Sequence, residues 1–187
     1  MKQTMKNIND LKQQIEKGKK FKYLFFWGHR QKSGQNVDKS CFSQWFPKGF
    51  TLGNVYYATA EHYMMAEKAR LFDASMVEKI LNAKSTKEVK ALGRKVKNFD
   101  DKIWEEASFG IVVKGNMAKF SQNEALKEFL LSTSNRVIVE ASPYDKVWGI
   151  GMLADNEKAT QPLKWRGLNK LGFALMVVRD EILKNTL

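Results

Sequence analysis

The sequence predicts an α+β fold, a compact single domain that is predominantly helical and contains a small sheet. Three observations lead to this prediction. The chain has 187 residues, which fits about one domain. Long segments repeat apolar residues at helical spacing, whereas the segments typical of strands are short and aromatic or β-branched. Along the chain, aromatic strands precede a run of helices, and one strand and one helix follow them.

Residues 1–20 are predicted to form a basic N-terminal helix or tail, separate from the domain at residues 21–187. Ile8, Leu11 and Ile15 recur at helical spacing on a lysine-rich background. Because this segment has little apolar surface, we expect it to dock weakly or to fray.

The domain itself opens with aromatic stretches. Residues 21–27 are a predicted strand, residues 28–40 a polar loop, and Tyr56 and Tyr57 a short extended piece. Thr59 then precedes good helix formers at residues 60–72, and its hydroxyl can accept a hydrogen bond from an amide of the first turn. This pattern predicts a helix that begins just after Thr59.

Helices are predicted over most of the remaining chain. Lysines and Arg94 line one face of a basic helix at residues 86–97, and Val89, Leu92 and Val96 line another. The other predicted elements are helices at residues 100–120, 124–131 and 169–183 and a strand at residues 136–141, buried on both faces. Gly115 is expected to weaken the longest of these helices.

The composition is that of an ordinary globular protein, with 43% hydrophobic and 28% charged residues. No apolar run approaches the roughly 20 residues needed to cross a bilayer. The first 22 residues lack the apolar stretch of a secretory signal. Cys41 is the only cysteine, which excludes an intramolecular disulfide. We therefore expect a cytoplasmic protein without a membrane partner.

The net charge of +12 is the first indication of a ligand. Clustered lysine and arginine side chains attract phosphates and raise the local concentration of anionic substrates. The same excess of charge could serve solubility alone, so both interpretations stay open.

Several common catalytic motifs are absent. The chain contains no GxxxxGK[ST] phosphate loop and no GxGxxG after a strand. With two histidines and one cysteine, a zinc site of the usual kind is not expected, and neither a metal nor a cofactor is predicted. A Ser-His-Asp triad would need His29 or His62, and nothing supports either. Carboxylates and lysines are therefore the acid–base candidates.

The most informative segment is EHYMMAEKA at residues 61–69. Glu61 and Lys68 are seven residues apart, so they project in almost the same direction from a helix. A lysine against apolar neighbours such as Met64 and Met65 can have a depressed pKa and act as an amine nucleophile. The alternative is a partly buried stripe whose charged ends reach solvent.

A second candidate segment, residues 140–151, follows the best predicted strand. Gly149 and Gly151 could let backbone amides approach an anionic or sugar ligand, and Trp148 could stack on a ring. Asp145 is a further acid–base candidate. An ordinary turn with a buried tryptophan would account for the same residues.

The third candidate segment is WRGLNKLGFALMVVR at residues 165–179. Asn169 stands where a helix is predicted to begin. It can be a simple N-cap, or part of an anion site, since helix N-termini favour phosphate.

Taken together, these motifs resemble the NADAR (YbiA-like) family of N-glycosidases. Besides the three segments above, the resemblance rests on DDKIW at residues 100–104 and MAKFSQN at residues 117–123, and it runs from about residue 24 to residue 183. The chain departs from the family's Ser-Asn-Phe pattern at residues 42–46, which read FSQWF. This departure leaves the role of Gln44 open.

The resemblance implies cleavage of an N-glycosidic bond and no metal. Its substrates would be phosphorylated ribosylamino-pyrimidines of riboflavin synthesis, or ADP-ribose on guanine in nucleic acid. It implies that Lys68 forms a Schiff base with the anomeric carbon of ribose, that Glu61 orients it or shuttles protons, and that Asp145 is a second acid–base group. The implied substrate-binding residues are Trp104, Trp148, Gly149, Gly151 and Asn169.

A function of another class is the alternative, a non-catalytic module that binds ADP-ribose or nucleic acid. The basic helix and the basic N-terminal segment support it. The combination of Glu61, Lys68 and Asp145 argues against it, because binding alone does not need these groups. The leaving base and the oligomeric state stay open.

Overall fold

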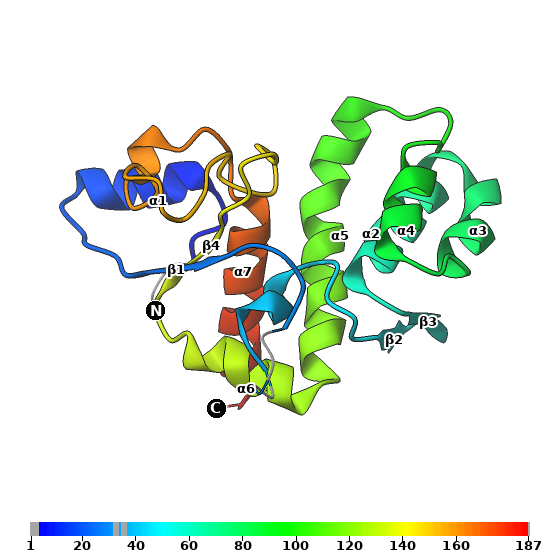
Figure 1. Ribbon diagram of the computed structural model, residues 1–187, viewed down its shortest axis with the longest axis horizontal. Coiled ribbons are helices and arrows are strands. Elements are labelled where there is room, and N and C mark those ends of the chain that lie inside the picture. Colours follow the sequence, from blue (N-terminus) through cyan, green and yellow to red (C-terminus); the bar gives the residue numbers. More distant parts are fainter. Residues whose placement is uncertain (1–3, 32–33, 35–36, 187) are drawn as a thin grey trace. The chain divides into compact units, whose positions relative to one another are not determined.

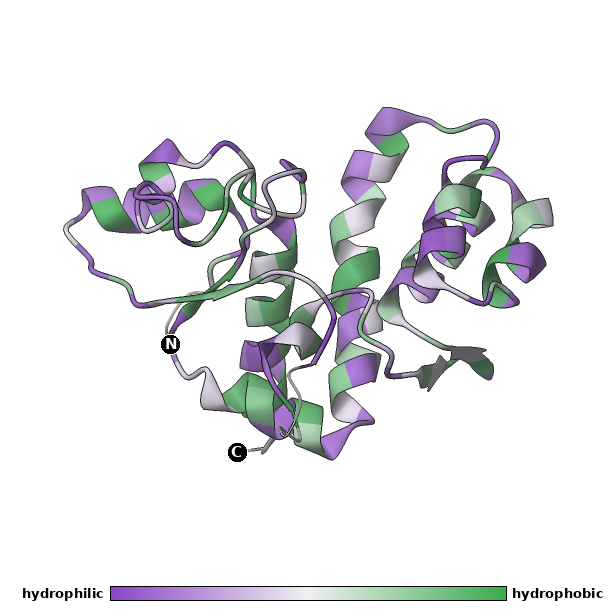
Figure 2. Ribbon diagram, viewed as in Figure 1, coloured by the Kyte–Doolittle hydropathy of each residue, from purple (hydrophilic) through white to green (hydrophobic). Residues whose placement is uncertain are grey.

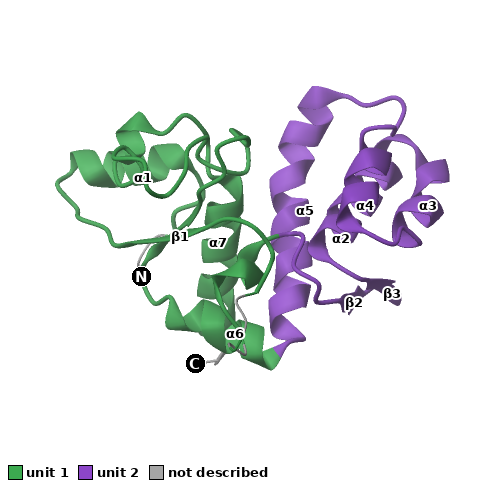
Figure 3. Ribbon diagram, viewed as in Figure 1, with its two compact units in different colours: residues 1–43, 124–187 green, residues 44–123 purple. Residues whose placement is uncertain are grey.

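The computed structural model describes residues 4–31, 34 and 37–186 (Figure 1). These residues contain seven α-helices, four short strands and three 3-10 helices, which confirms the predominantly helical α+β fold. The chain divides into two compact units (Figure 3). Unit 1 comprises Met1–Ser43 and Glu124–Leu187, and unit 2 comprises Gln44–Asn123.

Unit 1 is built on two parallel strands, β1 (Tyr23–Phe26) and β4 (Val137–Glu140). Tyr23 lies opposite Val137, and Phe26 lies opposite Glu140. The predicted burial of the second strand is confirmed, because its three apolar residues are 0% exposed. Helix α7 (Lys170–Thr186) packs on β4 with a largely apolar sequence, as the green stretches in Figure 2 show. Helix α6 (Glu124–Ser132) contacts α7.

The predicted N-terminal helix is present as α1 (Ile8–Glu16), with Asn7 as its N-cap. Ile8 and Leu11 are buried, and the Thr4 hydroxyl donates a hydrogen bond to Asp180 on α7. These contacts anchor α1 within unit 1. The division of the chain into residues 1–20 and 21–187 stays a prediction, and residues 1–3 lie outside the described part.

Unit 2 contains the hairpin β2 (Phe50–Leu52) and β3 (Val55–Tyr57), followed by helices. Helix α2 (Ala60–Phe72) begins where predicted, and the Thr59 hydroxyl accepts a hydrogen bond from the His62 amide. Its neighbours are α3 (Val77–Leu81), α4 (Thr86–Gly93) and α5 (Asp101–Ser121). Asp100 caps α5 by accepting bonds from the amides of Lys102 and Ile103.

Gly115 lies inside the long helix, and its weakening effect there stays a prediction. Helix α5 is continuous through this position. A Cβ at Gly115 would overlap the ring of Tyr63 on α2, so the glycine allows the two helices to approach closely. Tyr63 is 1% exposed at this contact, so its ring is buried between the two helices.

Two element boundaries differ from prediction. The basic helix ends at Gly93 rather than at residue 97, and the Lys95 amide bonds to the Leu92 carbonyl as the chain leaves the helix. Glycine favours such an end because of its low helix propensity. Part of the expected loop at residues 28–40 is a 3-10 helix at Lys39–Phe42, capped by Asp38. Residues 32, 33, 35 and 36 of that loop lie outside the described part.

Across the residues that the structure describes, no helix combines the length and the apolar character that crossing a membrane requires.

Candidate active site

Helix α2 carries the two predicted groups of unit 2, Glu61 and Lys68. Seven residues separate them, so they lie two turns apart, about 10 Å along the axis. Glu61 is 7% exposed, in the first turn, where the helix dipole favours a carboxylate. Lys68 is half-buried near the other end of the helix. The helix therefore presents a buried carboxylate and a partly accessible amine along one side.

The amine of Lys68 contacts a backbone carbonyl and two aromatic rings. Its Nζ donates a hydrogen bond of 3.0 Å to the carbonyl oxygen of Gly93, the last residue of α4. The same nitrogen is 4.0 Å from the ring centroid of Phe99 and 5.9 Å from that of Trp104. Trp104 lies in the first turn of α5, as part of the predicted substrate-binding set. One backbone acceptor and two aromatic rings thus fix the position of the amine.

Burial in these surroundings lowers the pKa of the Lys68 amine below its ordinary value, and the negative charge of Asp101 offsets part of that shift. A lowered pKa increases the fraction of neutral amine near neutral pH. The neutral amine is the form that can attack an electrophilic carbon. The electrostatics of unit 2 therefore suit Lys68 for nucleophilic chemistry.

Gly93 is what allows α4 to reach Lys68. A Cβ at this position would overlap the sulfur of Met65 on α2, and Gly93 is buried. Without a side chain, the end of α4 comes close enough for its carbonyl to accept the Lys68 bond. The glycine thus links helix packing to the placement of the amine.

We expect Gly93→Ala to destabilise the protein by about 1–3 kcal/mol, as overpacking of a close helix contact does. The loss should appear in urea unfolding followed by circular dichroism. Ala91→Gly, at an exposed position of the same helix, is the matched control and should cost only about 1 kcal/mol through helix propensity. If Gly93→Ala unfolded like the wild type, the close approach at Met65 would not constrain α4.

Gln44 supports the start of α2. Its carbonyl oxygen accepts a hydrogen bond from the Glu61 amide at 2.9 Å, and its side-chain oxygen accepts one from Asn116 of α5 at 2.8 Å. Gln44 is 9% exposed and Asn116 is 0% exposed. These bonds give Gln44 a structural part in holding Glu61.

In unit 1, Asp145 organises the loop after β4. Its Oδ1 accepts hydrogen bonds from the amides of Val147, at 2.8 Å, and Trp148, at 2.7 Å. Its carbonyl oxygen accepts a bond from the Gly151 amide at 3.1 Å. Asp145 and Trp148 are both half-buried. The loop is therefore a defined turn in which the Asp145 carboxylate accepts the backbone amide of Trp148.

Backbone geometry favours glycine at both glycine positions of this loop. Gly151 has a φ of 67°, in the left-handed region that favours glycine. A Cβ at Gly149 would lie 2.9 Å from the carbonyl oxygen of Glu140 and 3.0 Å from that of Asp145. Both glycines are buried, and the Gly151 amide already donates within the loop. Contacts of these glycines with a ligand stay a prediction.

The prediction that Asn169 caps the last helix with its side chain is wrong. Its Oδ1 accepts from the Glu140 amide and its Nδ2 donates to the Ile138 carbonyl, both at 2.9 Å. The residue has a φ of 53° and is 0% exposed. Asn169 thus ties the start of α7 to the end of β4, where the Asp145 loop begins, and direct binding of substrate by it stays a prediction.

The predicted site residues fall on both units. Unit 2 holds Lys68 beside Trp104, with Glu61 on the same helix as Lys68. Unit 1 holds the Asp145 loop with Trp148 and both glycines, and Asn169 supports the strand before that loop.

Two groups at Lys68 were missed by the sequence prediction. The ring of Phe99 lies against the amine, and the Gly93 carbonyl accepts its hydrogen bond. Phe99 is one position before the Asp100 cap, in a short link without periodicity, so no pattern points to it. Gly93 lies inside the basic helix predicted at residues 86–97, so its place at the helix end was not predicted.

No group of three or more histidine, cysteine, aspartate or glutamate side chains within residues 4–31, 34 and 37–186 could hold a metal ion. His62 has a structural place, since its Nδ1 lies 2.8 Å from the Thr59 hydroxyl and its Nε2 3.2 Å from the Ala83 carbonyl oxygen. Burial lowers the pKa of His62, although the Ala83 bond and the Glu88 charge act in the opposite direction.

The chain is similar in sequence and in fold to known proteins. The NADAR domain model matches residues 25–183. The chain is 45% identical over 167 residues to N-glycosidase R617 of Acanthamoeba polyphaga mimivirus, covering 86% of this chain and 96% of the relative. It is 36% identical over 135 residues to the chloroplastic riboflavin biosynthesis protein PYRR of Zea mays, covering 68% of this chain and 20% of that protein. The solved structure of the E. coli protein YbiA matches with a TM-score of 0.69 and 25% identity, covering 88% of this chain and 87% of that one.

These similarities define an enzyme of the hydrolase class, an N-glycosidase. The chain belongs to the NADAR family. The resemblance inferred from the motifs is thereby confirmed, and a purely non-catalytic binding module is set aside in favour of an enzyme.

Proposed function

We propose that the chain hydrolyses the N-glycosidic bond between a base and a phosphorylated ribose through a Schiff base on Lys68. The observation that carries this proposal is the setting of the Lys68 amine. A half-buried amine that bonds to the Gly93 carbonyl, lies 4.0 Å from the Phe99 ring centroid and has a lowered pKa is suited to attack on a carbon.

In the proposed reaction, the neutral amine of Lys68 attacks the anomeric carbon of the ribose. The bond from that carbon to the base nitrogen breaks, and the base leaves with a proton. Ring opening moves a proton to the ring oxygen and leaves an iminium between the anomeric carbon and Nζ. Water then adds to the iminium carbon, and the C–N bond to Lys68 breaks. The products are the free base and the free sugar phosphate, with one water consumed.

Proton transfer in these steps needs carboxylates, and we assign it to Glu61 and Asp145. Glu61 is buried on the same helix as Lys68, which supports a part in orienting the amine or shuttling protons. Asp145 is the second acid–base group, and its Oδ1 is held by two amides. Positioned groups of this kind typically contribute about 10²–10⁴-fold each.

Aromatic rings are assigned to the leaving base. Trp104 is 5.9 Å from the Lys68 nitrogen, measured to its ring centroid, and Trp148 is held beside Asp145 by the loop. Gly149, Gly151 and Asn169 are assigned to the sugar hydroxyls and the phosphate, with Asn169 acting through its hold on the loop.

We propose a phosphorylated ribosylamino-pyrimidine as the first substrate candidate. The similarity to a protein named for riboflavin biosynthesis supports it. ADP-ribosylated guanine in nucleic acid is the second candidate, favoured by the net charge of +12 and by the exposed Lys87 and Lys90 of α4. A cytoplasmic location, expected from the lone Cys41, stays a prediction.

One assay tests the proposed activity and separates the two candidates. Purified protein is offered a ribosylamino-pyrimidine phosphate and an oligonucleotide with ADP-ribosylated guanine, and the released base is measured by chromatography. We expect release of the base from the pyrimidine compound. The ratio of the kcat/KM values for the two compounds then identifies the preferred substrate. Release of base from neither compound would contradict the proposed function.

A further inference from the structure

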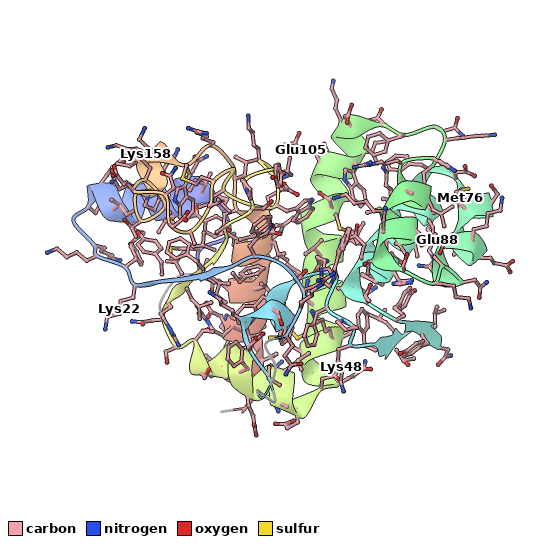
Figure 4. The ribbon with its side chains drawn as sticks, viewed as in Figure 1. Lys22, Lys48, Met76, Glu88, Glu105 and Lys158 are labelled. Carbon is pink, nitrogen blue, oxygen red and sulfur yellow. The ribbon has the colours of Figure 1, made fainter. Side chains whose placement is uncertain are left out.

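A groove in unit 1 is lined by none of the candidate site residues. It is bounded by the end of α1, the chain that enters β1, and the segment at Pro162–Lys164, and its volume is about 560 Å³. Lys22 and Lys158, labelled in Figure 4, lie on the two chain segments that border it. The volume is within the range of small-molecule and nucleotide sites, roughly 300–1,000 Å³.

The walls of the groove are held by contacts within unit 1. Helix α1 ends where the Gly18 amide bonds to Ile15, with Gly18 at a φ of 82°, so the chain turns toward β1. On the other side, the Trp165 indole donates a 2.7 Å hydrogen bond to the Ala159 carbonyl, and Pro162 is buried. Helix α1 contacts this second segment directly. Hydrogen bonds and the contact of α1 with the Pro162–Lys164 segment therefore hold both walls of the groove.

The lining combines positive charge with apolar rings. Three exposed lysines line it, Lys19, Lys20 and Lys164, and none of its lining residues is acidic. Two half-buried aromatic side chains, Phe21 and Tyr23, share the lining. This combination complements a ligand that is both anionic and flat.

On the aromatic side of the groove, two ring contacts hold Tyr23 in place. Tyr23 stacks on Phe25 with ring centroids 5.9 Å apart, and its edge meets Trp165 at 6.3 Å. Burial raises the pKa of the Tyr23 phenol, so it stays neutral and adds no negative charge to the groove. Rings held in this way can stack with bases at little entropic cost, while lysines follow a phosphate backbone.

We propose that this lysine groove, lined by Lys19, Lys20, Phe21, Tyr23, Leu163 and Lys164, binds single-stranded nucleic acid. Single strands present phosphates and unstacked bases together, which is the chemistry that the lining matches. The exposed Leu163, 54% accessible, adds apolar contact for a sugar or a base. The lining does not include Lys68, so the proposal does not depend on the proposed Schiff base.

The test measures binding of a fluorescent 12-nucleotide oligothymidylate by anisotropy at several salt concentrations. The groove variant is Lys19→Gln/Lys20→Gln/Lys164→Gln. The matched control is Lys48→Gln/Lys79→Gln/Lys114→Gln, which removes the same charge from exposed positions of unit 2 that lie outside the basic helix α4. We expect the groove variant to bind at least about tenfold more weakly, with the slope of log K against log salt reduced by about 2. The control should keep its slope within about 0.5.

Further variants address stacking and the relation to catalysis. Phe21→Leu keeps an apolar side chain and should lose about fivefold or more in affinity through the missing ring. Lys68→Ala should bind the oligonucleotide as the wild type does, and the groove variant should keep its turnover of a ribosylamino-pyrimidine phosphate. These two results keep a failure of the groove distinct from a failure of the proposed reaction.

Three outcomes would overturn the proposal. Equal losses in the groove and control variants would mean that net charge alone attracts the strand. If the wild type did not bind the oligonucleotide at low salt, single-stranded nucleic acid would not be the ligand of the groove. Binding to phosphatidylglycerol vesicles without binding to the oligonucleotide would assign the groove to a lipid surface.

Discussion

Lys68→Ala should lose at least about 10³-fold in kcat while remaining folded. The amine is the proposed nucleophile, and an alanine side chain cannot form the iminium. The fold should persist because Lys68 is half-buried and its amine bonds to a single backbone carbonyl, that of Gly93, at the end of α4. Steady-state release of the base, with circular dichroism for the fold, measures both effects.

Two control variants sharpen this result. Lys68→Arg keeps the positive charge beside Phe99 but cannot form a Schiff base, so it should be as inactive as Lys68→Ala. Lys90→Ala removes a lysine of α4 that lies over Trp45, and should keep near wild-type turnover of the small substrate. A folded Lys68→Ala variant that retains most of its activity would remove Lys68 from the mechanism.

The lowered pKa of Lys68 gives this account a pH dependence with a definite sign. Between the lowered value and the ordinary one, the unfolded chain binds more protons at this position than the folded chain. The free energy of unfolding should therefore rise with pH across that window in the wild type, and Lys68→Met should lose this contribution. Activity should rise with pH toward the same lowered pKa, as the neutral amine forms.

Asp145→Asn should lower kcat by about 10²–10⁴-fold with little change in KM, because it removes an acid–base group and keeps the loop. The asparagine Oδ1 can still accept the amides of Val147 and Trp148 that the aspartate holds. Asp145→Ala, which loses these bonds as well, is the comparison and should also lower the melting temperature. Steady-state kinetics and thermal unfolding separate the two variants.

Trp148→Ala, in the same loop as Asp145, tests substrate binding rather than catalysis. If the indole stacks on the leaving base, its loss should weaken substrate binding by about 1–3 kcal/mol and appear mainly in KM. If Asp145→Asn and Trp148→Ala changed only the melting temperature, the loop would be an ordinary turn with a structural tryptophan.

Local sequence signals were sufficient for much of this fold. The Thr59 hydroxyl and the run of helix formers after it predicted both ends of α2, because capping and propensity act over a few residues. The apolar run at Val137–Glu140 predicted a strand buried on both faces. Spacing along α2 likewise placed Glu61 and Lys68 on one side.

Contacts between residues distant in sequence were beyond such signals. The carbonyl that holds Lys68 belongs to Gly93, 25 residues further along, and its position depends on how α4 packs against Met65. Asn169 could be read as a helix cap from its place in the sequence, yet its partners lie on β4, 29 and 31 residues earlier. A pattern within one segment carries no information about such partners.

The central claim is a covalent bond between Lys68 and the ribose, and borohydride trapping tests it most directly. The protein is mixed with a ribosylamino-pyrimidine phosphate in the presence of sodium borohydride, digested and analysed by mass spectrometry. The account predicts a reduced pentose-phosphate adduct on the peptide that contains Lys68, absent from Lys68→Arg and from protein without substrate. Turnover under the same conditions without borohydride, combined with no adduct on Lys68 or with an adduct on another lysine, would contradict it.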